Sequence, residues 1–260
     1  MASSQAASAH CSSSGHSSPF NATVKRITST EEDSVIEIID NDTTAGNLLV
    51  TNILADCILP VANGGCCSHA IYFDLSQHFD LLRLICVLEG KAKAEESEIR
   101  SWMKRLHLIR CRDLHQLIIT LLSIEPLIAN SKYPVKLMVL DGLGTNYWHE
   151  QFVGGYCQYL KEHNYKRLIS NLKSMLDKYN FSVLVRTVEI FSQKSKERQV
   201  SVTDHRNLQL YGESWAELVS HRFFLSKALK CDGKTSKIFL RNLLLNTESV
   251  LEVRDRFIVQ

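Results

Sequence analysis

Short runs of β-branched and aliphatic residues alternate with longer segments of helical period along most of this chain. Strands are expected at 35–39, 69–75, 107–111, 135–141 and 181–191. Helical segments separate them, and parallel strands require crossover connections of this kind. The alternation predicts an α/β fold with a mostly parallel sheet and helices on both faces.

Apolar spacing and capping residues locate the helices. They are expected at 45–57, 78–90, 95–106 and 114–128, with a long fifth helix whose apolar stripe is Leu168, Leu172, Met175, Leu176 and Tyr179. Gly90 is expected to end the second helix, and Asp113 to cap the fourth. Because 114–128 is apolar on nearly every side, we expect it to be deeply buried.

The C-terminal part predicts a short helix and a strand within 213–227. Two further strands, 237–245 and 250–259, are joined near Asn246, as in a hairpin. These last strands are expected to extend the sheet in antiparallel fashion.

The N-terminal segment and the overall composition suggest one domain with a tail. Residues 1–33 are rich in Ser and Ala and are predicted to be a disordered tail, although a Ser-rich, acid-poor start is also typical of an organellar transit peptide. Residues 34–260 suffice for one core domain. The net charge of +2 does not by itself argue for nucleic acid. No apolar run approaches the roughly 20 residues that span a bilayer, so no membrane partner is expected.

The eight cysteines are scattered through apolar segments, as expected of reduced core thiols in an intracellular protein. Cys66, Cys67 and His69 form the one metal-like cluster. Its spacing lacks the C-x₂-C pair of a zinc site, so no metal site is predicted.

The segment from Asp40 to Asn47 has the length and position of a phosphate-binding loop, G-x-x-x-x-G-K-[ST]. In such a loop glycines bring backbone N–H groups to the phosphates, lysine reaches them, and the hydroxyl binds magnesium. Here Asp40 and Ala45 stand at the glycine positions, Gly46 at the lysine position and Asn47 at the hydroxyl position. Residue types alone indicate only a strand, a turn and a helix.

The strand "VKLMVLD" ends in Asp141 and has the form of a Walker B strand, in which a terminal carboxylate orders magnesium. A buried strand with an acidic end is an equally simple interpretation.

Three stretches carry a family resemblance: "ADCILPVANGGCCSHAIYFDLSQHFDLLRL" (55–84), "VKLMVLDGLGTNYW" (135–148) and "SWAELVSHRFFLSK" (214–227). Together they resemble the paralogues of the eukaryotic RecA-like strand-exchange recombinase, from about Val35 to Lys227. The resemblance implies a RecA-like P-loop NTPase core without the small N-terminal domain of longer paralogues. It also implies a nuclear role in homologous recombination. The implied partners are other recombinase paralogues in a heteromeric complex, and single-stranded or branched DNA.

Carried over by position, the resemblance implies a degenerate nucleotide site made of Asp40, Thr43, Thr44, Gly46, Asn47 and Asp141. Ser76 stands where active recombinases hold the acid that orients water, and Glu189 where they hold a coupling glutamine. Each lost group typically costs a factor of 10² or more in rate. We therefore expect no catalytic residue, no enzyme activity and no cofactor.

The resemblance also implies DNA contacts. The stretch 192–209 stands where recombinases place a DNA-binding loop, and two aromatic residues follow Asp141. The candidate DNA-binding residues are Lys194, Lys196, Arg198, Arg206, Tyr147 and Trp148.

Two alternatives remain. One is a DNA-stimulated ATPase that binds ATP and magnesium through an unusual loop. The other is an unrelated α/β enzyme acting on a small molecule at the strand ends. The chain has neither a Ser–His–Asp spacing nor a G-x-G-x-x-G motif to support the second alternative.

Overall fold

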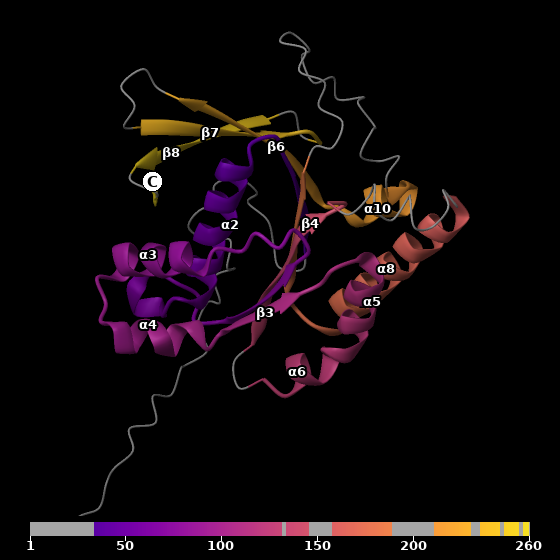
Figure 1. Ribbon diagram of the computed structural model, residues 1–260, viewed down its shortest axis with the longest axis horizontal. Helices are drawn as coiled ribbons and strands as arrows, with labels where there is room; N and C mark the ends of the chain where they lie inside the picture. The colour runs from indigo at the N-terminus through magenta and orange to yellow at the C-terminus, as the bar shows by residue number, and fades with distance from the viewer. Residues whose placement is uncertain are drawn as a thin grey trace, which may run out of the picture.

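A nine-stranded sheet runs through the computed structural model, which describes residues 34–131, 134–145, 158–188, 211–229, 235–244, 247–254 and 257–259 (Figure 1). The strands are β1 Val35–Asp40, β2 His69–Asp74, β3 Leu106–Arg110, β4 Val135–Leu143, β5 Ser182–Val188, β6 His221–Leu229, β7 Thr235–Asn242, β8 Thr247–Arg254 and β9 Phe257–Val259.

The strand order is β3-β2-β4-β5-β1-β6-β7-β8-β9. Pairing is parallel from β3 to β6 and antiparallel from β6 to β9. The expected α/β class, with a mostly parallel sheet and antiparallel C-terminal strands, is confirmed.

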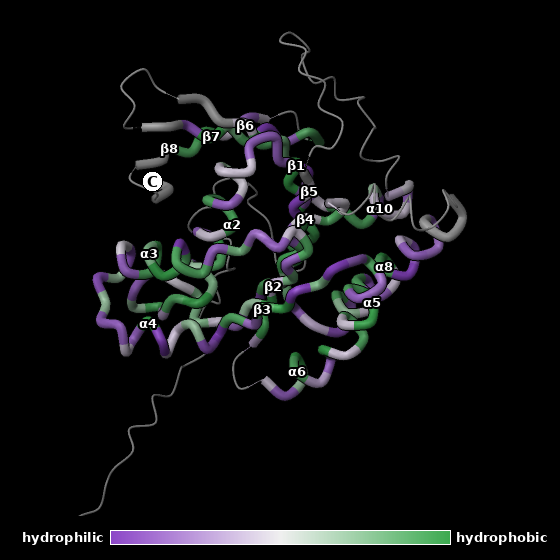
Figure 2. Tube along the Cα trace, viewed as in Figure 1, coloured by the Kyte–Doolittle hydropathy of each residue, from purple (hydrophilic) through white to green (hydrophobic). Residues whose placement is uncertain are grey.

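Helices cover both faces of the sheet. One face carries α2 Thr43–Ile58, α3 Leu81–Ala92 and α4 Glu96–Met103, and the other carries α5 Leu114–Ser123, α6 Glu125–Ala129, α8 Gln158–Lys178 and α10 Glu213–Leu218 (Figure 1). A short 3-10 helix, η1 Val61–Asn63, follows α2. Each face has its own apolar cluster. Alternation along β1 explains this, since Ile36 and Ile38 face α2 while Val35 faces the opposite side. Figure 2 shows the apolar stretches along the central strands.

Two helix predictions were wrong. Helix α3 continues through Gly90 to Ala92 and is capped by Lys93, whose φ is 49°. Glycine inside an exposed helical turn costs only about 1 kcal/mol, so Gly90 does not end it. Helix α5 is not buried on every side, since the residues Ile119 and Leu122 are 67% and 57% exposed. The chain changes direction at Ile124, and α5 buries only one face against the sheet and α8.

Several boundaries also differ from those expected. Helix α2 begins at Thr43, two residues early, because the Asp42 side chain accepts a hydrogen bond from the Ala45 N–H and caps it there. The C-terminal hairpin is confirmed, but β8 already begins at Thr247, and the expected last strand is divided into β8 and β9. Among the described helices, none is long and apolar enough to cross a membrane. The predicted N-terminal tail lies outside the described residues.

Candidate functional site

Four neighbouring parallel strands carry an ionisable side chain at their carboxyl ends, on the face covered by α2. They are Asp74 on β2, Asp141 on β4, Arg186 on β5 and Asp40 on β1, and each is at most 1% exposed. Period-two alternation puts them on this face, since residues two positions earlier in these strands belong to the α2 cluster. Open α/β sheets place their ligand sites at this edge.

Arg186 lies at the centre of this edge. Its Nε forms an ion pair with Asp141 Oδ1, and its Nη1 lies 3.5 Å from Asp40 Oδ2. The same Nη1 donates a hydrogen bond to Asn47 Oδ1 of α2, while the Tyr72 hydroxyl donates to Asp141 Oδ2. We call these five residues the arginine–aspartate cluster. It connects the four strands β1, β2, β4 and β5 to the first turns of α2.

The cluster has more negative than positive charge, since one guanidinium faces two carboxylates. Burial raises the pKa of Asp40 from its ordinary value of 3.8 to about 6, although the positive charge of Arg186 opposes the rise. Burial likewise raises the pKa of Asp141, against the opposing effects of Arg186 and the Tyr72 hydrogen bond. Burial and the neighbouring Asp141 charge raise the pKa of Tyr72, which therefore remains a donor.

Asp74 has a separate, local role. Its carboxylate accepts hydrogen bonds from Ser76 Oγ at 3.3 Å and from the backbone N–H groups of His78 and Phe79 at 3.2 and 3.3 Å. These contacts shape the turn between β2 and α3. Ser76, at the position that the resemblance gives to a water-orienting acid, is thus a buried hydroxyl bonded to Asp74.

The connection from β1 to α2 is too short to form a phosphate-binding loop. Only Asn41 and Asp42 separate the strand from the helix, so Thr43 to Asn47 are already helical. The backbone N–H groups of Ala45 and Gly46 bond to Asp42, through its side chain at 2.9 Å and its carbonyl at 3.0 Å. Donors that would cradle a phosphate are therefore engaged within the helix. The exposed residues Thr43 and Thr44 lie on this first turn.

Gly46 stands where an active site of this type holds its lysine. A Cβ at Gly46 would lie 1.9 Å from Asp40 Oδ2 and 3.0 Å from Arg186 Nη1. A longer side chain there requires Asp40 to move. Taken with the capped helix, this means that the residues present do not fit a magnesium–nucleotide complex.

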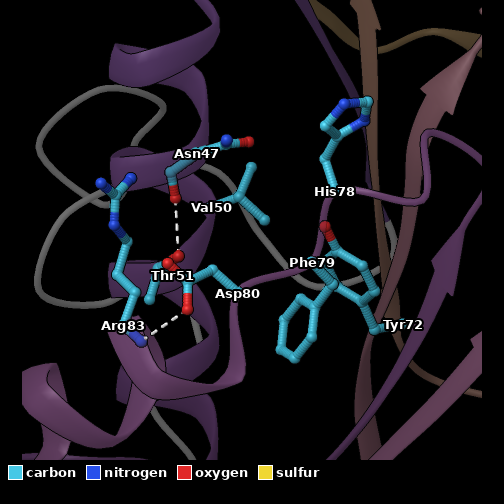
Figure 3. A pocket seen from close by; sticks show the side chains of 8 residues that line it. All are labelled: Asn47, Val50, Thr51, Tyr72, His78, Phe79, Asp80 and Arg83. Carbon is cyan, nitrogen blue, oxygen red and sulfur yellow. Dashed lines mark hydrogen bonds between the residues drawn. The ribbon is translucent and has the colours of Figure 1, made fainter.

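A shallow hollow lies beside the cluster, between α2 and the segment linking β2 to α3 (Figure 3). Its volume of about 250 Å³ includes space open to solvent. Thr51 Oγ1 bonds to the Asn47 carbonyl on one side, and the Arg83 N–H bonds to Asp80 on the other. The lining residues are Asn47, Val50, Thr51, Tyr72, His78, Phe79, Asp80 and Arg83.

The structure brings together three of the predicted nucleotide-site residues, Asp40, Asn47 and Asp141, and places Gly46 against Asp40. Sequence reasoning missed Arg186 and Tyr72. The signal for Arg186 was a single charge within the apolar strand "SVLVRTV", because a buried charge requires a partner.

Seven of the predicted residues lie outside the described part of the chain. Glu189 and all six candidate DNA-binding residues, Lys194, Lys196, Arg198, Arg206, Tyr147 and Trp148, lie outside the described residues. His69 Nδ1 lies 2.8 Å from His107 Nε2 on the neighbouring strand. Across the described ranges, no three His, Cys, Asp or Glu side chains gather as metal ligands.

Replacing Asp40 by Asn is expected to stabilise the protein at pH 7. The folded state keeps the Asp40 proton up to a pH near 6, whereas the unfolded chain releases it near 4, so wild-type stability falls as pH rises through that window. Asn removes this dependence, and the gain at pH 7 should be about 1–3 kcal/mol, shrinking toward pH 4. Urea denaturation at both pH values measures it.

The matched control for this prediction is Asp113→Asn. Asp113 caps α5 through the Gln116 N–H, and Asn caps equally well, so little change is expected at either pH. A stability difference between Asp40→Asn and wild type that is the same at pH 4 and pH 7 would contradict the assignment.

Comparison with known proteins identifies a family and a relative. The family model described as Rad51 matches residues 24–260. The chain is 26% identical over 208 residues to the DNA repair protein XRCC2 of Mus musculus, and the match covers 76% of this chain and 74% of the mouse protein. The resemblance to recombinase paralogues, and with it the RecA-like core, is confirmed.

Proposed function

The chain belongs to the Rad51 family, and on that premise we propose that it is a non-catalytic subunit of a recombinase-paralogue complex. Its relative in the mouse is by name a DNA repair protein. The proposed process is homologous recombination repair of double-strand breaks and stalled forks in the nucleus. The proposed partners are other recombinase paralogues, with which it supports recombinase assembly on single-stranded DNA.

The observation that carries the non-catalytic part is the arrangement around Arg186. Phosphoryl transfer depends on positive charge and donors aimed at the γ-phosphate. Here the helix N-terminus is capped by Asp42, Asp40 fills the space beside Gly46, and Arg186 is engaged by two carboxylates. These contacts support the proposal that the site does not orient or activate an attacking water.

We expect the purified full-length chain to show no ATP hydrolysis above background, with or without single-stranded DNA. Phosphate release measured beside an active recombinase of the same fold checks this. The competing function is a DNA-stimulated ATPase. Turnover that follows the protein through purification and disappears with Asp141→Ala would establish that function instead.

The DNA part of the proposal rests on the four cations of the stretch 192–209, which are Lys194, Lys196, Arg198 and Arg206. Replacing all four by Ala should weaken single-strand binding by the assembled complex uniformly across sequences, because such contacts reach phosphates rather than base edges. The log–log salt slope should fall by no more than roughly 3, at about 0.7 per contact. Fluorescence anisotropy at several salt concentrations measures both. Equal affinity and slope would exclude this stretch as the DNA contact.

A further inference from the structure

We propose that Arg186 is a built-in counter-ion that stands in the place of the metal–nucleotide complex and fixes the ends of β1, β4 and β5 to α2 in one arrangement. The inference deepens the proposed function and rests on it for the identity of the site. It predicts that the carboxyl ends of β1, β4 and β5 keep the same arrangement, without bound nucleotide, whether or not ATP is present.

The reach of Arg186 carries the first step. From β5 the guanidinium contacts Asp141 on the neighbouring strand β4, Asp40 on the other neighbour β1, and Asn47 on α2. In a working site the lysine and the magnesium ion bring positive charge to this edge, and bound phosphates join the strand ends to the helix. Here a side chain of the protein makes those connections, and it cannot dissociate.

Charge balance carries the second step. Asp40 and Asp141 are both buried and need a cation between them. A structural ion pair elsewhere in the sheet has one carboxylate, not two, for its arginine. Glu37, on the opposite face, is a single carboxylate that accepts from Arg222 Nε at 2.5 Å and from Trp215 Nε1 at 3.2 Å. Two carboxylates converging on one cation, at the ligand edge, distinguish the Arg186 site from this pair.

The steric fit carries the third step. Asp40 Oδ2 occupies the space into which a side chain at position 46 would project, and Arg186 Nη1 lies beside it. The helix cap engages the backbone N–H donors that would bind nucleotide phosphates. The ion pair fills the space beside Gly46 that the phosphates would need. A site emptied only by loss of its lysine would instead leave that space open.

The test removes the tethered cation from the full-length chain and supplies a free one. Arg186→Ala leaves two converging carboxylates, so millimolar magnesium chloride should raise its thermal midpoint by roughly 2–4 °C relative to sodium chloride of equal ionic strength. Wild type should not respond. Arg222→Ala is the matched control, because it also loses a buried arginine but leaves the single carboxylate of Glu37. A magnesium response of Arg186→Ala no larger than that of Arg222→Ala would overturn the proposal.

A second measurement tests the built-in counter-ion even if Arg186→Ala does not fold. Wild-type protein is titrated with a fluorescent ATP analogue and magnesium, and no saturable binding is expected up to millimolar concentration. Saturable binding would overturn the proposal. If that binding came without hydrolysis, and the protein still assembled with other paralogues, the proposed function would stand while the built-in counter-ion failed.

Discussion

Replacing Arg186 by Met is expected to lower the free energy of unfolding by about 3–5 kcal/mol. The methionine keeps most of the side-chain volume, so the loss is one of charge. Asp40 and Asp141 would be left buried and uncompensated, and Asn47 would lose its donor. Urea denaturation at pH 7, read by fluorescence and circular dichroism together, measures the change.

Two further variants isolate the charge effect. Arg100→Met removes an arginine from an exposed pair with Glu96 and should not change stability measurably. In a background of Asp40→Asn, Arg186→Met should lower the free energy of unfolding by less than in wild type, because only Asp141 is then left as an uncompensated buried charge. If Arg186→Met were as mild as Arg100→Met, the guanidinium would not be the centre of the site.

Replacing Trp215 by Ala is expected to cost about 3–5 kcal/mol of stability. Trp215 is fully buried and packs against Tyr211, with ring centroids 5.5 Å apart. Its Nε1 also donates to Glu37, which is buried in the middle of β1. The substitution therefore leaves a cavity under α10 and removes one donor from a buried carboxylate.

A conservative variant separates these two effects. Trp215→Phe keeps most of the packing but loses the donor, and should cost about 1–3 kcal/mol. Thermal and urea denaturation of both variants measure the difference. A loss below about 1 kcal/mol for Trp215→Ala would contradict the packing described here.

Much of the fold could be predicted because its signals are local. The apolar runs of β1 and β4, the cap at Asp113 and the stripe on α8 follow from periods of 2 and 3.6 residues that any short window reveals. The errors came where a local preference is weak or where packing overrides it. Gly90 does not end α3, and Ile119 and Leu122 of α5 face outward because only one side of that helix meets the sheet.

The candidate site was predicted only in part. Asp40, Asn47 and Asp141 were predicted because the family resemblance gives their positions to the nucleotide site, and the resemblance does not show what they contact. The pattern suggested a loop that had lost its lysine. The structure instead has a capped helix and a carboxylate beside Gly46, since the early cap at Asp42 brings Thr43 to Asn47 into α2.

The sequence by itself determined the succession of strands and helices along the chain, the antiparallel C-terminal extension and the absence of the phosphate-loop lysine. Only the tertiary structure decided what replaces that lysine. Asn47 and Arg186 are 139 residues apart in the chain, and they meet because β5 lies beside β1 and α2 covers both. Strand order within a parallel sheet is set by the packing of crossover helices over the whole domain. A local period of apolar residues therefore cannot reveal which distant side chains will form a buried ion pair.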